Sequence, residues 1–349
     1  MELRSARFDE RDEVLDLLAL WYGDRNFFAR YNHNDPSFRD ALCLVARIDG
    51  RLVGTAQIFD RRIRLCGRSF SAAGLGSVFV HPDYRGRGIG SSLLSLAVAT
   101  MEREGFEVSL LFSDRIDFYQ RFGWRSVPRT ITILSPPKDG SFPDSPVANV
   151  VFRRFDAEAD LARVSAIYDR YSGQFNTSIV RDLPYWRGNL VYAGNPEELF
   201  VVARSAELNS PLAAYARIIR YFELPMVMEY GYEPDARHIM VSLFEHLLAL
   251  ACGRARESFL ACDPLASLLL PTNEGSAAAG LLTQTAHDPP LEADLRQRGF
   301  SLTYYADNNY MWRLVDSARV LKSLGFASER DFFAAVSSRN ALFWTADRF

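Results

Sequence analysis

One stretch of the sequence, residues 75–94, limits the fold more than any other. It reads LGSVFVHPDYRGRGIGSSLL, and its first part is apolar and β-prone. Pro82 has no amide hydrogen, so it ends the strand. Glycines and arginines follow, and after them Leu93, Leu94 and Ala97 recur at helical spacing. The stretch therefore predicts a strand, a glycine-rich turn and a helix.

The glycine-rich turn is suited to holding phosphate. Glycine permits positive φ and has no Cβ, so successive amides can point at one spot. The start of the helix adds free N–H groups and a partial positive charge, and Arg85 and Arg87 add full charges at the rim. No Lys-Ser/Thr pair follows the glycines, and the spacing differs from the dinucleotide fingerprint. The alternative is a tight strand-to-helix turn without a ligand.

This motif, V-x-P-x-Y-R-G-x-G-I-G, resembles the acetyl-CoA motif of the GNAT superfamily of N-acetyltransferases. A second signature of that superfamily follows at Leu110–Trp124: a strand, a short helix, then aromatic-Tyr-x-Arg-Phe-Gly-aromatic. The resemblance implies that the turn holds the CoA pyrophosphate and that a bulge splays the preceding strand, so that its backbone pairs with the pantetheine arm. The donor-binding residues expected are Val78, Phe79, Val80, Arg85, Gly86, Arg87, Gly88, Ile89, Gly90 and Ser91, with Ser113 and Asp114 either touching CoA or capping the next helix.

Composition sets the broad class of the protein. At 349 residues the chain exceeds one ordinary α/β domain of about 100–200 residues, so two domains are expected. With 48% hydrophobic residues it can build real cores, and a net charge of -3 gives no sign of a nucleic-acid or membrane surface. The charged start has no signal-peptide pattern, no stretch is apolar enough to span a membrane, and the four cysteines are scattered. We therefore expect a cytoplasmic protein without a metal site; a homo-oligomer is compatible with the sequence.

The pattern of elements occurs twice. Strands and helices from Leu3 to a last strand at Thr130–Leu134 follow the GNAT order, and a breaker-rich linker begins at Ser135. The sequence HPDYR at 81–85 is then echoed by EPDAR at 233–237, each after an apolar strand and before an apolar helix. We predict an α/β (α+β) chain of two tandem GNAT folds, each a mixed, mostly antiparallel sheet flanked by helices. The expected units are a catalytic domain at 1–137, a degenerate second domain at 148–316 and a tail at 317–349.

The second copy lacks the residues of a phosphate site. Where the first copy has Gly86–Gly90, the second has HIMVS at 238–242. Without glycines the amides cannot converge on a pyrophosphate, and β-branched residues resist the required φ. One donor site, in the first domain, is therefore expected, and the second domain would shape the acceptor pocket.

Tyr119 is the candidate general acid. The resemblance places the superfamily's tyrosine at this position, and a phenol with a pKa of about 10 is protonated at neutral pH and can serve a departing thiolate. A packed aromatic residue is the alternative. On the acceptor side, Trp21, Tyr22, Asp24 and Phe28 lie where GNAT proteins build the acceptor pocket; an aromatic wall with a carboxylate suits a cationic amine, although core packing explains it nearly as well.

The end of the sequence extends the resemblance. MWRLVD at 311–316 is similar to the stretch that closes the second domain of the Eis-type tandem acetyltransferases, bacterial enzymes that acetylate amines of aminoglycosides and lysines. That resemblance covers residues 1–320 and implies that the free carboxylate of the final residue, Phe349, is the general base. A tail that only packs on the second domain is the alternative. Those enzymes carry a further domain of sterol-carrier-protein type, of which we expect only a tail of about thirty residues here. This departure leaves their hexameric assembly and broad acceptor pocket in doubt.

Two classes of function fit these features. The first is an acetyl-CoA-dependent N-acetyltransferase that acts on a primary amine of a small molecule or peptide, by direct transfer in a ternary complex. The alternative is a non-catalytic CoA or acyl-CoA-binding module, or an acyltransferase with a different acyl-CoA. Tandem GNAT folds also resemble the aminoacyl-tRNA-dependent peptidoglycan transferases, but those need a basic RNA groove and this chain is slightly acidic.

Overall fold

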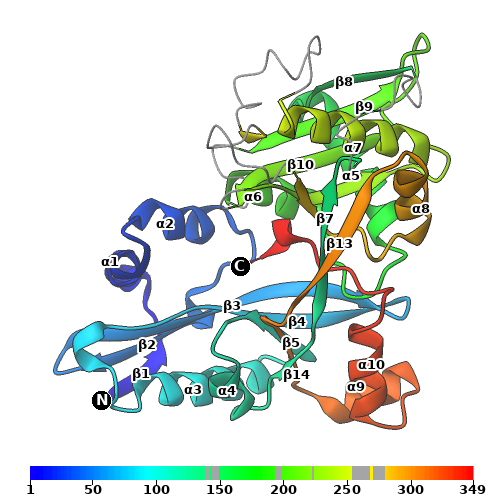
Figure 1. The fold of residues 1–349 in the computed structure, drawn as a ribbon. Helices are drawn as coiled ribbons and strands as arrows, with labels where there is room; N and C mark the ends of the chain where they lie inside the picture. Colours follow the sequence, from blue (N-terminus) through cyan, green and yellow to red (C-terminus); the bar gives the residue numbers. More distant parts are fainter. Residues whose placement is uncertain are drawn as a thin grey trace.

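The protein was analysed as a computed structural model, which describes residues 1–137, 142, 149–192, 198–221, 224–253, 268–269 and 280–348. Elements of its first part alternate between strands and helices as expected (Figure 1). They are β1 (Glu2–Ser5), α1 (Arg11–Tyr22), α2 (Arg25–Asn34), β2 (Cys43–Ile48), β3 (Arg51–Leu65), β4 (Arg68–Val80), α3 (Ile89–Arg103), β5 (Val108–Phe112), α4 (Ile116–Gln120), β6 (Arg125–Ser126) and β7 (Arg129–Ser135).

Elements of the second part repeat this plan. They are β8 (Val150–Arg154), α5 (Ala157–Ser172), α6 (Leu183–Tyr192), β9 (Leu199–Ser205), β10 (Ala214–Tyr221), β11 (Leu224–Tyr232), α7 (Arg237–Ala251), β12 (Leu281–Thr283), α8 (Pro289–Gln297), β13 (Ser301–Asp307) and β14 (Tyr310–Leu314). The chain then forms α9 (Ser317–Leu324), α10 (Glu329–Val336) and a 3₁₀ turn at Thr345–Asp347.

The described strands form two seven-stranded sheets. The first has the order β1-β2-β3-β4-β5-β14-β6 and the second β13-β7-β12-β11-β10-β9-β8. Within them β4–β5 and β11–β12 run parallel, and the other pairs are antiparallel. Helices flank both sheets, so the expected fold class is confirmed (Figure 1).

Helices cover both faces of the first sheet. On one face α1 and α2 bury Val14, Leu18 and Phe28, while α3 buries Leu93 and Leu94 on the other (Figure 1). Apolar residues at helical spacing in α1 and α2 need such a sheet face to pack on.

The two sheets exchange strands. The strand expected at Thr130–Leu134 is present as β7, but it lies in the second sheet between β12 and β13, with Ile133 opposite both Leu282 and Thr303. In return β14 enters the first sheet beside β5, with Trp312 opposite Leu110. Placing β7 in the first sheet was wrong, because a local pattern predicts a strand but not its partner. Figure 1 shows β7 and β13 running between the two halves.

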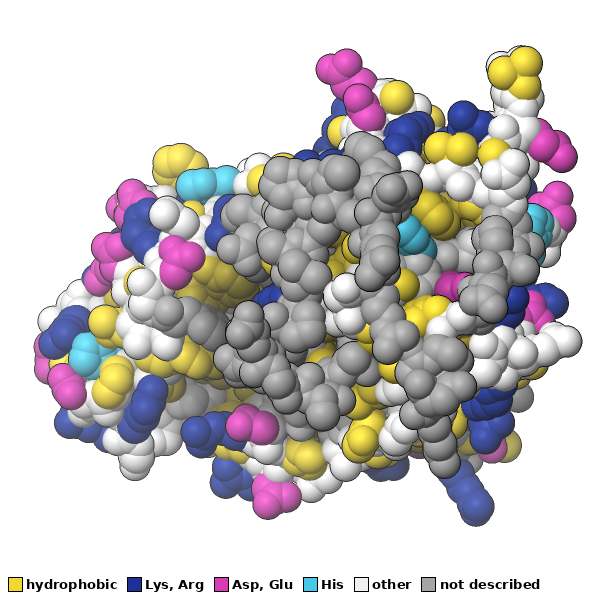
Figure 2. Space-filling view, turned by 45° about the horizontal axis from the view of Figure 1, so that its top comes forward, with side chains coloured by type: hydrophobic (Ala, Val, Ile, Leu, Met, Phe, Trp, Pro, Cys, Tyr) yellow, Lys and Arg dark blue, Asp and Glu magenta, His cyan; other side chains and the backbone are white. Residues whose placement is uncertain are grey.

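The surface shows charges of both signs. On the face in Figure 2, acidic and basic side chains are intermixed over the described residues. No helix in the described ranges is both long and apolar enough to cross a membrane.

Candidate active site

The first sheet opens between β4 and β5. The two strands pair in parallel from Ala72↔Val108 to Leu75↔Leu111, and β4 then continues alone on that side to Val80. On its other side β4 carries a bulge, because its register with β3 jumps from Gln57↔Gly76 to Thr55↔Phe79. Ser77 in the bulge has a φ of +50°. A bulge bends and twists a strand, so the backbone of 76–80 is turned away from β5 and left open.

The glycine-rich turn lies directly after this open strand. Gly86 and Gly88 have φ values of +76° and +78°, which residues with a side chain rarely adopt. Gly88 is the N-cap of α3. In the described structure the amides of Gly86 to Ser91 donate to no backbone carbonyl, and the first bond of the helix joins Ser92 N to Gly88 O at 3.0 Å. A run of free amides at a helix N-terminus attracts an anion.

Basic and aromatic residues surround the turn. Arg85 donates to the carbonyl of Val80 at 3.2 Å and lies over the ring of Phe79, and the guanidinium of Arg87 lies over Tyr84. His81 Nδ1 accepts from the amide of Asp83 at 3.3 Å, so this histidine orders the turn. Ile89 is buried, while Gly90 lies beneath Phe118 of α4. The predicted donor-binding residues 78–80 and 85–91 thus lie in one stretch of the chain, in which residues 85–88 are exposed and Phe79 and Ile89 are buried.

Tyr119 lies in α4, the short helix that follows β5. It is 9% exposed, packs edge-on against Phe118 and Trp124, and has the hydroxyl of Ser113 as a hydrogen-bond partner. Burial raises the pKa of Tyr119 to about 12, and the Ser113 contact opposes this without overcoming it. Ser113 also accepts from the amide of Arg115, the residue before α4, at 3.0 Å. Tyr119 is therefore protonated at neutral pH, beside the point where β4 and β5 part.

The residues expected on the acceptor side have different surroundings. Trp21 is half exposed and stacks on Phe79 at 5.8 Å, so it lies next to the open strand. Phe28 is 5% exposed and belongs to the core beneath α1 and α2. Asp24 accepts from the amide of Asn26 at 2.8 Å at the start of α2. The side chain of Tyr22 lies outside the described residues, and Asp114 is exposed.

The end of the chain crosses both domains. After α10, residues 341–348 run between the two sheets toward the end marked C in Figure 1. The guanidinium of Arg348 lies 4.6 Å from the ring centre of Phe112, the last residue of β5. Phe349, the expected base, lies outside the described residues. The described part of the tail reaches the end of β5 through Arg348.

A separate cavity of about 570 Å³ is lined in part by residues 341–343 of the tail. Its wall includes Arg129, His287, Tyr310 and Phe343, and none of the residues predicted to bind donor or acceptor. Burial lowers the pKa of His287 to about 4, so this side chain is neutral at pH 7. The described residues contain no cluster of three or more His, Cys, Asp or Glu side chains that could hold a metal ion.

The second domain forms no counterpart of the cradle, which is the run of free amides from Gly86 to Ser91. Helix α7 begins at Arg237, and Ile239, Met240 and Val241 are buried within it. No residue between 233 and 251, all of which are described, has a positive φ. A short turn at 233–236 therefore joins β11 to α7, and the glycine-rich turn of the first domain has no counterpart there.

Comparisons with known proteins agree with this geometry. The sequence profile of the acetyltransferase (GNAT) domain matches residues 2–127. An acetyltransferase of Sodalis glossinidius is 37% identical over 102 residues, which are 27% of this chain and 63% of that relative. The chain thus spans less than two thirds of the relative's length.

Solved structures extend the likeness in fold to both domains. A probable N-acyltransferase of Enterococcus faecalis has a TM-score of 0.63 at 13% identity, covering 90% of this chain and 72% of its own. Eis1 of Mycobacterium abscessus has 0.59 at 17% identity, covering 92% and 75%. N-myristoyltransferase of Saccharomyces cerevisiae, with bound myristoyl-CoA, has 0.53 at 13% identity, covering 88% and 79%. At these identities the likeness concerns the fold, which is a tandem GNAT-like fold. The matching profile and the relatives show that residues 2–127 are similar to GNAT acetyltransferase domains.

Proposed function

We propose that the chain is an acetyl-CoA-dependent N-acetyltransferase, which moves an acetyl group directly to a primary amine of a small molecule or peptide in a ternary complex. The observation that carries this proposal is the opening between β4 and β5, beside the free amides of Gly86 to Ser91 and the phenol of Tyr119. A module that only binds CoA would need the cradle but not a protonated phenol in α4, just after β5.

The residues have distinct roles in the proposed reaction. The amides of the turn, with Arg85 and Arg87, hold the pyrophosphate, and the open backbone of Val78 to Val80 pairs with the pantetheine arm. A free N–H of that strand polarises the thioester carbonyl. The amine nitrogen attacks this carbonyl, a C–N bond forms and the C–S bond breaks. Tyr119 gives its proton to the leaving sulfur, because a phenol of raised pKa is still protonated at pH 7.

Two groups serve the acceptor in this proposal. Trp21, stacked on Phe79, forms a wall over the open strand, where the face of an indole attracts a cationic amine. The carboxylate of Phe349 takes the proton that the amine loses; support for this comes from Arg348, which brings the tail to Phe112.

The direct test is mass spectrometry of products formed from acetyl-CoA and a panel of amines, including lysine peptides and amino sugars. Gain of one acetyl group on an amine supports the proposal. Tight binding of acetyl-CoA without any product would instead favour the binding module. The same panel with longer acyl-CoA donors tests the other alternative, since one fold neighbour holds myristoyl-CoA.

A further inference from the structure

The second domain repeats the opening of the first. Strand β11 carries a bulge, because its register with β10 passes from Arg217↔Glu229 to Ile218↔Val227 and leaves Met228 unpaired. In the described residues β11 and β12 pair only at Met226↔Leu282, so β11 continues alone beyond that point. Strands β11 and β12 thus correspond to β4 and β5, although the second domain has no cradle.

The tail of the chain fills this second opening. Trp344 is fully buried, lies 5.0 Å from Tyr230 of β11 and donates from Nε1 to Ser172 Oγ at 3.0 Å. Asn189 donates to the carbonyl of Ala346 at 2.8 Å, and the 3₁₀ turn that ends at Asp347 contacts β11. The site that holds the donor in the first domain thus holds part of the chain itself in the second.

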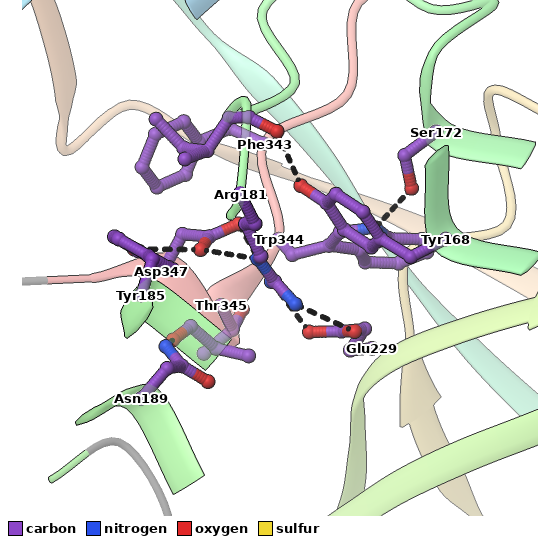
Figure 3. A network of polar contacts seen from close by, with 12 residues as sticks. Tyr168, Ser172, Arg181, Tyr185, Asn189, Glu229, Phe343, Trp344, Thr345 and Asp347 are labelled. Carbon is purple, nitrogen blue, oxygen red and sulfur yellow. Dashed lines mark hydrogen bonds and ion pairs between the residues drawn. The ribbon is translucent and has the colours of Figure 1, made fainter. Parts of the chain in front are cut away.

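An ion network fixes the tail there (Figure 3). Arg181 lies between Glu229 of β11 and Asp347 of the tail, with contacts of 2.7 and 2.8 Å, and all three side chains are 0% exposed. Tyr185 donates to Asp347 at 2.9 Å. Arg217 of β10 bridges Glu229 and Glu198, the residue that precedes β9. Buried charges are tolerated when paired and hydrogen-bonded, so Asp347 is part of a closed set that cannot shift without leaving Arg181 undercompensated.

We infer that the second domain is a socket for the tail of this chain, and that Asp347 is a positioning residue for acyl transfer, a role that rests on the proposed function. Asp347 fixes the next residue, Arg348, against Phe112. Phe112 directly precedes Ser113, the partner of Tyr119. Releasing Asp347 therefore moves the tail away from the end of β5, while the cradle that binds the donor is left untouched.

The test compares Asp347→Asn with Asp160→Asn. Asp160 is also buried and accepts from Arg153 at 2.5 and 2.6 Å, but it lies at the start of α5 and has no contact with the tail. We expect Asp347→Asn to lower kcat by about 10-fold or more and to leave the affinity for acetyl-CoA unchanged. The reason is that displacing a reacting group by about 1 Å can lower the rate about 10²-fold. Asp160→Asn should lower thermal stability but keep kcat, and Asp347→Glu, which keeps the charge, should restore part of the rate.

A second measurement separates this inference from the proposed activity. Hydrogen exchange of the amides at 342–348 needs no substrate, and Asp347→Asn should speed exchange in this segment while Asp160→Asn does not. If the tail stays protected and kcat is unchanged in Asp347→Asn, the socket inference is overturned. If exchange rises in the tail but the parent protein acetylates no amine, the socket stands and the proposed function fails. If Asp347→Asn does not fold, Arg348→Ala takes its place, because this change keeps the ion network. Arg348→Ala must then lower kcat and leave thermal stability unchanged.

Discussion

Replacing Tyr119 by phenylalanine tests the chemistry of the candidate site most sharply. The change keeps the ring that packs against Phe118 and Trp124 and removes only the proton and the contact with Ser113. Because Ser113 still accepts from the amide of Arg115, the loss of stability should be about 1 kcal/mol, the usual worth of one hydrogen bond. Loss of a positioned acid should lower kcat by about 10²-fold or more.

The pKa of Tyr119 sets the pH dependence of this effect. With a pKa of about 12, roughly one molecule in 10³ has an ionised phenol at pH 9, whereas an unperturbed tyrosine of pKa about 10 would be ionised in roughly one of ten. Raising the pH from 7 to 10 should therefore not remove the acid. The parent and Tyr119→Phe rates should differ by the same factor across this range.

The assay is steady-state release of CoA thiol with saturating acceptor, together with calorimetry of acetyl-CoA binding. Tyr232→Phe is the matched control, because Tyr232 is 8% exposed and donates to Asp288 at 2.7 Å in the second domain. It should lose a similar amount of stability and keep kcat. Full kcat in Tyr119→Phe would show that Tyr119 only packs. A fall in the parent's kcat near pH 10 that the mutant lacks would refute the raised pKa.

Three further changes test the donor site, the base and the stability of the first domain. Gly88→Glu puts a negatively charged side chain into open space at the cradle, so calorimetry should find acetyl-CoA binding abolished. Gly67→Glu is the control, because Gly67 also lies in open space with a similar φ of +73°, and this variant should bind acetyl-CoA as the parent does. One glycine appended after Phe349 moves the carboxylate by about 3.5 Å and should remove most turnover but not donor binding; unchanged turnover would exclude this base. Glu10 has its pKa lowered to about 2 by its hydrogen bonds with Arg4, so it stabilises the fold above its ordinary pKa of 4.5 and less as pH falls toward 2. Glu10→Gln should thus lower Tm at pH 7, with a gap to the parent that closes below pH 4.5.

The sequence predicted the cradle well because its signals are local. The strand, Pro82, the two glycines of positive φ and the start of α3 all fall within residues 75–94, and each follows from the properties of its own residue type. Fold class and the second copy were also predictable, since patterns of apolar residues and the echo at 233–237 repeat along the chain.

The features that the sequence did not predict depend on distant partners. Arg181 is separated in sequence from Glu229 by 48 residues and from Asp347 by 166, and no residue pattern near Arg181 predicts either contact. One signal was available: Arg217 and Glu229 are charged residues within apolar strands, and such residues need buried partners. The exchange of β7 and β14 could not be predicted from the local sequence, because the residue pattern of each strand is compatible with either sheet.

The two domains use one architectural device in opposite ways. In each, a bulge parts a strand from its parallel neighbour and leaves backbone groups open. Open polar groups in a fold must find a partner, either water, a ligand or another part of the chain. In the first domain glycines keep the adjoining turn free, so a ligand can be that partner. In the second, Arg217 and Glu229 flank the bulge, and the pocket is closed by Arg181 and the tail. A socket of this kind links the position of the tail to the integrity of the second domain. Replacement of Glu229 should therefore affect the candidate active site of the first domain without any contact to it.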